Sequence, residues 1–121
     1  MAEMRVLVGA TRYGDSCSFY GTLLGFPVHE EWDDPDGRGM LFDTGAGLIE
    51  VVEDSPDHPA LPPQGVSVAL EVEDAVALHE RLGRAGLAFT EPIGDRPWGH
   101  RSFSLTDPSG LALTFFEVLG R

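Results

Sequence analysis

Few side chains of this protein are suited to chemistry, and most of them stand alone in the sequence. Glu50 lies inside an otherwise apolar run, residues 48–52. The single cysteine, Cys17, rules out an internal disulfide and a cysteine-rich zinc cluster, and its place in a predicted helix indicates packing. No Ser–His–Asp or Cys–His pair is recognisable. The other candidates are the four histidines and the two tryptophans: His29, His58, His79, His100, Trp32 and Trp98.

These residue types favour binding over covalent catalysis. Trp32 and Trp98 offer large flat surfaces, on which aromatic stacking contributes ~0.5–1.5 kcal/mol beyond burial. A cation over such a ring adds ~0.5–2 kcal/mol. Acid–base chemistry with Glu50 and His100 is the alternative, since a carboxylate and an imidazole can exchange protons when geometry allows.

The charge of the chain is strongly negative. Twenty acidic residues face eight basic ones, all arginine, for a formal net charge of −12 at pH 7. This charge repels phosphate backbones and argues against nucleic acid as a partner. It suits a cationic ligand, or serves only to keep the protein soluble. No apolar run approaches the ~20 residues of a membrane span, and no signal peptide is recognisable, so we expect a cytoplasmic protein without a membrane partner.

The first part of the chain, residues 4–53, is predicted to contain one helix and four strands. Asp15 and Ser16 are candidate N-caps, apolar residues follow at helical spacing, and Gly25 ends the helix. The predicted strands cover residues 5–9, 26–32, 38–43 and 48–53.

A proline-rich linker, residues 54–64, separates this part from a second one with the same order of elements. It contains four prolines and His58, and cannot be a helix. In residues 65–119, Asp74 caps a helix that Gly86 ends, and its inward side chains are expected to be Val76, Leu78, Leu82 and Ala85. The predicted strands cover residues 66–72, 87–92, 98–105 and 111–118.

The repeated order predicts an α+β fold built from two βαβββ repeats in a single domain, residues 1–121. One repeat alone has a curved sheet with an apolar face and open edges. Two repeats together bury this surface and form a trough, which is the expected binding groove.

Three motifs resemble those of the vicinal-oxygen-chelate superfamily, which includes glyoxalases, bleomycin-resistance proteins and dioxygenases. They are SFYGTLLGF at residues 18–26, PWGHRSF at residues 97–103 and DPSG at residues 107–110. The Pro-Trp-Gly element and the length of the chain are most similar to bleomycin-resistance-type binding proteins. The resemblance implies the same fold, a ligand groove and a homodimer.

The resemblance also locates the positions at which metalloenzymes of this superfamily hold their ion. They fall near Val8, on Glu50, near Ser67 and on Thr114. Of these only Glu50 is a plausible ligand, whereas a catalytic zinc needs about three protein ligands. Glu117 lies nearby but faces the other side of its strand. We therefore expect neither a metal nor another cofactor.

A metal-free groove is predicted to bind a ligand through its walls. Trp98 matches the Pro-Trp-Gly element and is the first candidate, with a rim or dimer contact as its other interpretation. Trp32, Phe42 and Phe103 are the further aromatic candidates, and Val8, Ser67 and Thr114 complete the expected lining. Glu50 should be paired, either with Arg5 or Arg101 or with a cationic ligand, because an unpaired buried carboxylate is costly.

The sequence thus predicts a protein that binds and sequesters a hydrophobic or aromatic small molecule, including a cationic one. This role follows from the resemblance. The alternatives are an enzyme, either a lyase or isomerase or a dioxygenase, that uses Glu50 with or without a metal, and a dimeric protein whose groove has lost its function.

Overall fold

The computed structural model describes residues 2–120, which form two compact units. The first unit consists of the chain up to Pro63 together with Pro108–Gly110. The second consists of Gln64–Asp107 and the residues from Leu111 onward. Within residues 2–120 no helix has the length and apolar character needed to cross a membrane.

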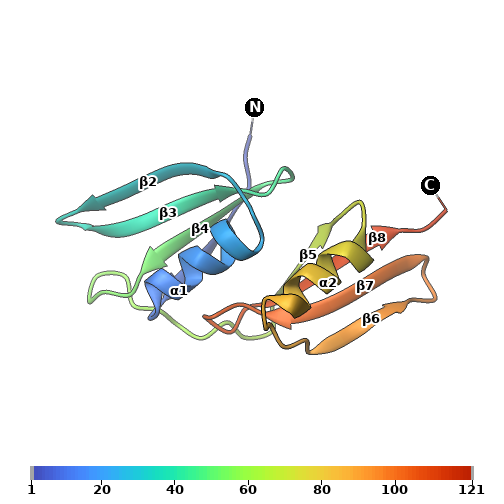
Figure 1. The fold of residues 1–121 in the computed structure, drawn as a ribbon. Helices are drawn as coiled ribbons and strands as arrows, with labels where there is room; N and C mark the ends of the chain where they lie inside the picture. Colours follow the sequence, from blue (N-terminus) through green and yellow to red (C-terminus); the bar gives the residue numbers. More distant parts are fainter. Residues whose placement is uncertain (1, 121) are drawn as a thin grey trace. The chain divides into compact units, whose positions relative to one another are not determined.

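The first unit is a four-stranded mixed sheet with a helical segment on one face (Figure 1). Its strands have the spatial order β1-β4-β3-β2, with β1 and β4 parallel and the other neighbours antiparallel. The elements are β1 (Arg5–Ala10), α1 (Tyr13–Ser18), the π-helical turn η1 (Phe19–Leu23), β2 (Val28–Asp34), β3 (Gly37–Asp43) and β4 (Leu48–Glu53).

The helical segment of this unit begins earlier than its sequence indicates. Its N-cap is Arg12, whose side chain makes no capping hydrogen bond. Asp15 therefore lies in the first turn, where its negative charge interacts favourably with the helix dipole. The segment ends at Gly25, whose φ of +76° suits a residue without a side chain. Phe19 and Tyr20, which belong to this segment, are buried, and Tyr20 contacts Phe42 of the sheet.

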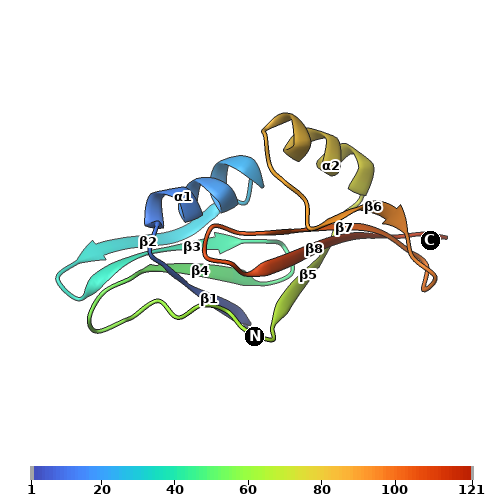
Figure 2. The same ribbon diagram turned by 90° about the horizontal axis from the view of Figure 1, so that it is seen from below.

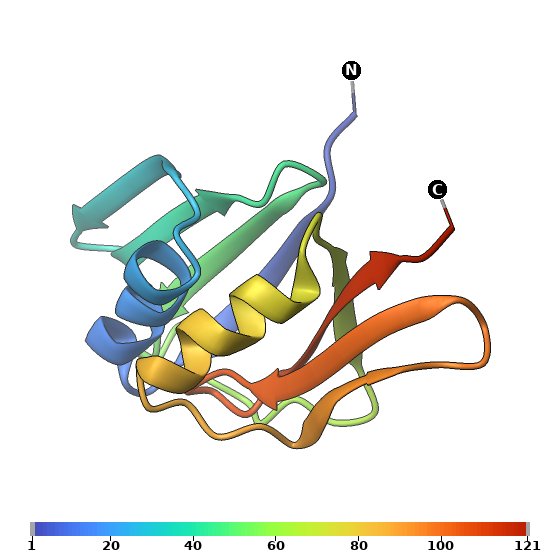
Figure 3. The same cartoon turned by 45° about the vertical axis from the view of Figure 1, so that its right-hand side comes forward.

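The second unit repeats this arrangement. Its order is β5-β8-β7-β6, again with the outer pair β5 and β8 parallel. Figures 2 and 3 show that each helix lies on one face of the sheet of its own unit. The elements are β5 (Ser67–Glu71), α2 (Ala75–Arg84), β6 (Glu91–Asp95), β7 (His100–Thr106) and β8 (Ala112–Val118).

Helix α2 is capped as predicted, but its buried side differs. The Asp74 carboxylate accepts a hydrogen bond of 3.0 Å from the amide of Ala77. Ala75 and Leu82, seven residues apart, are fully buried, whereas Val76 is 40% exposed. Ala85 is exposed as well. Of the four side chains expected to face inward, Leu82 is buried and Leu78 is partly buried, whereas Val76 and Ala85 are exposed. The apolar side of the helix is therefore narrower than predicted.

The two strands on either side of the Pro-Trp-Gly element begin later than predicted. Pro97 to Gly99 forms the turn between β6 and β7, with Gly99 at a φ of +88°, so Trp98 precedes the strand that was expected to contain it. Strand β6 begins at Glu91 and not near Leu87. Pro92 is tolerated there because β6 is an edge strand.

Both units have the order βαβββ, and the predicted fold class is confirmed. Alternation along each strand gives the sheet two faces. The face beneath the helix holds the core, which includes Ile49 and Val51 in the first unit and Leu113 and Phe115 in the second. The opposite face of each sheet, here called its open face, carries the side chains that alternate with these. One of them, Leu41, pairs with Glu50 and is nevertheless 0% exposed.

Candidate ligand-binding site

Glu50 projects from the open face of the first unit. Its neighbours along β4, Ile49 and Val51, are buried on the helix side, so alternation directs Glu50 the other way. In the parallel ladder Glu50 pairs with Leu7, which is 65% exposed. Val8, expected beside Glu50, is buried on the helix side. The residue that adjoins Glu50 is thus one position earlier in β1.

Trp32 lies flat on the same open face. It pairs with Gly39 of the neighbouring strand, and a methyl group built on Gly39 would overlap Cζ2, Cε2 and Cη2 of the indole. Only glycine leaves room for the ring in this position. The sheet thereby presents one aromatic face of Trp32, two strands away from Glu50.

A cavity of about 250 Å³ lies between these two side chains. Leu7, Val52 and Trp32 supply its apolar walls. Its ionisable lining is mainly acidic and consists of Asp34, Asp36, Glu50, Arg38 and His58. The first 63 residues contain twelve of the twenty acidic residues and three of the eight arginines, so the negative charge of the chain is concentrated in this unit.

Arg5 is the ion-pair partner of Glu50. Its Nη1 donates to Oε1 of Glu50 at 2.8 Å, and its Nε donates to Oε1 of Glu3 at 2.5 Å. These two hydrogen bonds raise the pKa of Arg5, that to Glu50 more than that to Glu3. Of the two arginines considered from the sequence, Arg5 therefore pairs with Glu50, while Arg101 pairs with Asp95.

His58 reaches this cavity from the proline-rich linker, a role that sequence reasoning did not assign to it. Ser55 and His58 exchange two backbone hydrogen bonds of 3.1 Å, and Asp54 accepts from the amide of Ala60 at 2.6 Å. Ala60 lies so close to Gly9 that a methyl group there would come within 2.9 Å of its Cα. The linker thus packs on β1. In the sequence, Gly9 was the one available sign of this contact, since a glycine inside a strand often marks the close approach of another segment.

The open face of the second unit has a different chemistry. Thr114 pairs with Ala69 in the ladder and shares a hydrogen bond of 2.8 Å with Ser104. Ser67 is exposed on the same face. His100 stacks on Phe116 with ring centroids 4.4 Å apart. This face combines hydroxyl groups and aromatic rings with one exposed carboxylate, that of Glu71, which pairs with Phe116 in the ladder.

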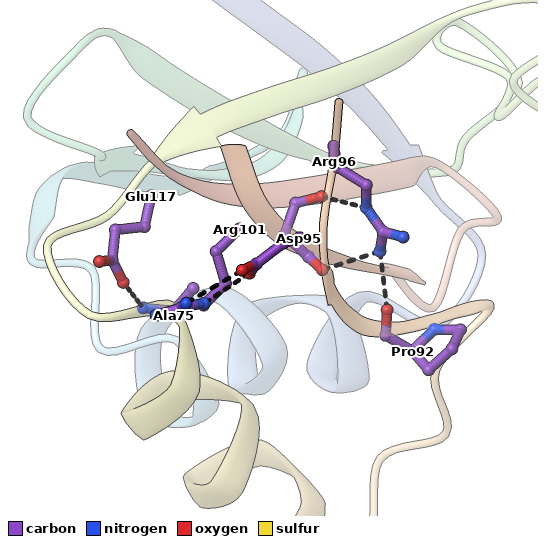
Figure 4. A network of polar contacts seen from close by, with 7 residues as sticks. Ala75, Pro92, Asp95, Arg96, Arg101 and Glu117 are labelled. Carbon is purple, nitrogen blue, oxygen red and sulfur yellow. Dashed lines mark hydrogen bonds and ion pairs between the residues drawn. The ribbon is translucent and has the colours of Figure 1, made fainter. Parts of the chain in front are cut away.

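Trp98 lies at the tip of the hairpin that joins β6 and β7 and is 68% exposed. Arg96 holds the base of this hairpin, since its side chain donates to Oγ and O of Ser102 and to the carbonyl of Pro92 at 2.8–3.0 Å (Figure 4). The same figure shows Arg101 paired with Asp95. The hairpin therefore leaves Trp98 exposed at its tip.

The two phenylalanines expected in the groove lie in the cores. Phe42 and Phe103 are both 0% exposed. Phe42 lies beneath Gly21 of the helical segment, and Phe103 contacts His79, Phe89 and Phe115. Both occupy the helix side of their strands, which corrects the expectation that they line a wall. His79, which was not expected to be a ligand, stacks on Phe89 as part of the core.

A second cavity of the first unit, about 390 Å³, is lined by Tyr13, Arg38 and Met40 among others. Arg38 lies over the ring of Tyr13 at 4.3 Å and pairs with Glu53 at 2.6 Å. Cys17 lies close by, and burial raises the pKa of its thiol. A protonated thiol is a poor nucleophile, so this region has no activated cysteine.

The residues at the positions of metal ligands do not fit a metal ion. Glu50 supplies one carboxylate, and Arg5 occupies it. Its ladder partner is Leu7, and the pair at the equivalent place in the second unit is Ala69 and Thr114. No group of three His, Cys, Asp or Glu residues within residues 2–120 is arranged to hold a metal. This donor set supports no metal-dependent step, and binding without a metal stays a prediction.

The sequence matches the family model of the glyoxalase/bleomycin resistance protein/dioxygenase superfamily over residues 5–115. The chain belongs to this superfamily, as the sequence motifs indicate. A comparison with curated proteins gives no significant match.

Among the solved structures with the same fold are three whose proteins are described differently from one another. TioX from Micromonospora sp. ML1 is 22% identical with a TM-score of 0.78, and the match covers 98% of this chain and 100% of TioX. TnmS3, an antibiotic binding protein from Streptomyces sp. CB03234, is 20% identical with a TM-score of 0.74, over 98% and 96%. Lactoylglutathione lyase from Agrobacterium tumefaciens is 16% identical with a TM-score of 0.71, over 96% and 92%. At these identities the likeness establishes the fold alone.

Proposed function

We propose that this protein binds an aromatic small molecule on the open face of the first unit, without a metal. The observation that carries this proposal is the ring of Trp32, which lies on Gly39 beside the cavity that contains Glu50. A flat aromatic surface, apolar walls and a few charged groups are the usual composition of a small-molecule site.

The size of the cavity limits what it takes. Its volume of about 250 Å³ is below the ~300–1,000 Å³ of pockets that enclose a drug-sized ligand. A second cavity of about 310 Å³ shares Leu7, Val52 and His58 with it, so a ligand larger than one fused ring system can extend along this face. Trp98, Ser67 and Thr114 remain candidate ligand contacts of the second unit, taken by itself.

The family supports a binding role in one respect. TnmS3, which shares the fold, is described as an antibiotic binding protein. We extend binding of a natural product to this chain as a proposal. A homodimer and a cytoplasmic location belong to the same proposal, and sedimentation velocity would test the first by finding twice the 13.1 kDa mass of the chain.

Fluorescence titration tests the site directly. In Trp98→Phe, Trp32 is the remaining tryptophan, and binding of N-methylquinolone should quench its emission. Calorimetry should detect the heat of the same binding event. Trp32→Ala should weaken binding of the same probe, while Trp98→Phe should leave it nearly unchanged. No binding of aromatic probes would contradict the proposal. Turnover of a probe that disappears in Glu50→Gln would instead favour an enzyme.

A further inference from the structure

Arg5 bridges two carboxylates that differ in their surroundings. It is the first residue of β1 and contacts Glu50 through Nη1 and Glu3 through Nε. The side chain of Glu50 is 14% exposed and lines the cavity, whereas that of Glu3 is 52% exposed and lies in the segment before β1. The guanidinium thus touches one carboxylate of the candidate site and one outside it.

Glu50 needs a cation because it is largely removed from water. A buried carboxylate without a partner is costly, so Arg5 cannot leave unless another positive group replaces it. A neutral ligand cannot take its place. A cationic ligand can, and the nearby Asp34 and Asp36 add to the attraction. Arg5 reaches the cavity only through its contact with Glu50, and Arg38, the arginine among the lining residues, is held by Glu53.

Glu3 gives Arg5 a partner after such a replacement. The hydrogen bond to Glu3 uses a different nitrogen from the one that contacts Glu50, so it can persist when the Glu50 contact breaks. The exchange therefore leaves no carboxylate without a cation. The pair of Arg5 and Glu3 is exposed and therefore weak, so it adds little resistance when the Arg5 side chain moves.

We propose that Arg5 is an internal competitor for Glu50, which a cationic aromatic ligand displaces onto Glu3. This inference rests on the proposed binding site and makes Arg5 a residue that determines specificity. The guanidinium lies beside Glu50, where the positive charge of such a ligand would pair with the same carboxylate. Ligands without a positive charge bind beside it through Trp32 and gain nothing from Glu50.

Two variants should shift affinity for a cation in opposite directions. The probes are N-methylquinolinium and its uncharged counterpart N-methylquinolone, measured by calorimetry. Arg5→Gln should tighten N-methylquinolinium about fivefold, because apparent affinity falls with the fraction of protein whose site is blocked. Glu3→Gln should weaken the same probe about twofold, since Arg5 then has Glu50 as its sole partner. N-methylquinolone should respond to neither change.

Arg101→Gln is the matched control. Its pair with Asp95 has a similar length, 2.7 Å, its side chain is as exposed as that of Arg5, 36% against 37%, and the substitution removes the same charge from the chain. The carboxylate of this pair is 57% exposed and lies outside the cavity. It should leave both probes unchanged. Glu50→Gln should abolish the preference for the cation, alone and combined with Arg5→Gln.

The possible results separate this inference from the proposed function. If Arg5→Gln weakens N-methylquinolinium, Arg5 orients Glu50 and the inference is wrong, although the site stands. The inference is also wrong if Arg5→Gln tightens both probes equally, or if Arg101→Gln has the same effect. If neither probe binds the unaltered protein, both the site and the inference fail.

Discussion

Gly39 supports the indole of Trp32 because it has no side chain. A methyl group there would overlap three carbons of the ring. We expect Gly39→Ala to destabilise the protein by ~1–3 kcal/mol, as overpacking does, and to weaken binding of aromatic probes because the ring must move. Urea denaturation and the emission spectrum of the Trp98→Phe background measure the two effects.

Gly14→Ala is the control for this substitution. Gly14 lies in α1, and a methyl group there meets nothing within 4 Å. Alanine suits a helix interior better than glycine by ~0.5–1 kcal/mol, so stability should rise and binding should not change. Equal effects of the two variants would show that Gly39 has no special relation to Trp32.

The pair of Asp95 and Arg101 makes a prediction about pH. The hydrogen bond from Arg101 holds the pKa of Asp95 below its ordinary value of 3.8. A lowered pKa in the folded state adds stability above the unfolded pKa, and this stability is lost as the pH falls through the folded pKa. An NMR titration should therefore find Asp95 titrating below 3.8, and Arg101→Gln should raise its pKa. An unchanged pKa in the variant would contradict the ion pair.

Sequence reasoning proposed Glu50 and Trp32 as ligand contacts but did not predict which residues surround them. Glu50 stands out because it interrupts an apolar strand, which is a local signal. Val8 was placed beside it because a shift of one residue changes the face of every side chain in a strand. His58 could not be found locally, since its position depends on how the linker folds back over β1.

At the scale of single elements, α2 offers the clearest test. Asp74→Ala removes the acceptor for the amide of Ala77 and should cost ~0.5–2 kcal/mol of unfolding free energy. Leu82→Ala leaves a cavity in the core and should cost ~2–5 kcal/mol. Thermal or urea unfolding measures both.

Val76→Ala provides the comparison within the same helix. Val76 was predicted to face inward but is 40% exposed, so its truncation should cost much less than that of Leu82. If Val76→Ala lowered the free energy of unfolding as much as Leu82→Ala does, a different side of α2 would have to face the sheet.

The bounds of a strand were predicted well where turn-forming residues flank it on both sides, and poorly where such residues are missing. The bounds of β4 agree with the prediction because Gly47 and Asp54 flank an unbroken apolar run. The region before β6 has no such signal, and tertiary pairing with β7 decides where the strand begins. The predicted location of Trp98 in a strand failed for another reason: Pro97 and Gly99 on either side of it form a turn.

At the scale of the whole molecule, the net charge should act on ligand association. A formal charge of −12, concentrated in the first unit, attracts cations over a distance that salt shortens. The screening length falls from ~30 Å at about 0.01 M salt to ~8 Å at about 0.15 M. Binding of N-methylquinolinium should weaken over this range, while N-methylquinolone should not respond. Equal responses of the two probes would exclude an electrostatic contribution.

The order of elements made the fold predictable from the sequence. Each unit was recognisable because strand, helix and three strands follow one another twice, with glycines at the helix ends. The open faces were not predictable in the same way. Their composition depends on register between strands, such as the pairing of Trp32 with Gly39, which no local pattern encodes.

Strand β2, which carries Trp32, is also an edge of its sheet. An unpaired edge is a template for pairing with another chain and hence for aggregation. Four of the seven residues of β2 are acidic, and its register shifts between Val28 and Glu30, two features that discourage such pairing. One of these acidic residues, Asp34, also lines the proposed ligand site. Redesigning this strand for a neutral ligand would favour fibril formation at the same edge.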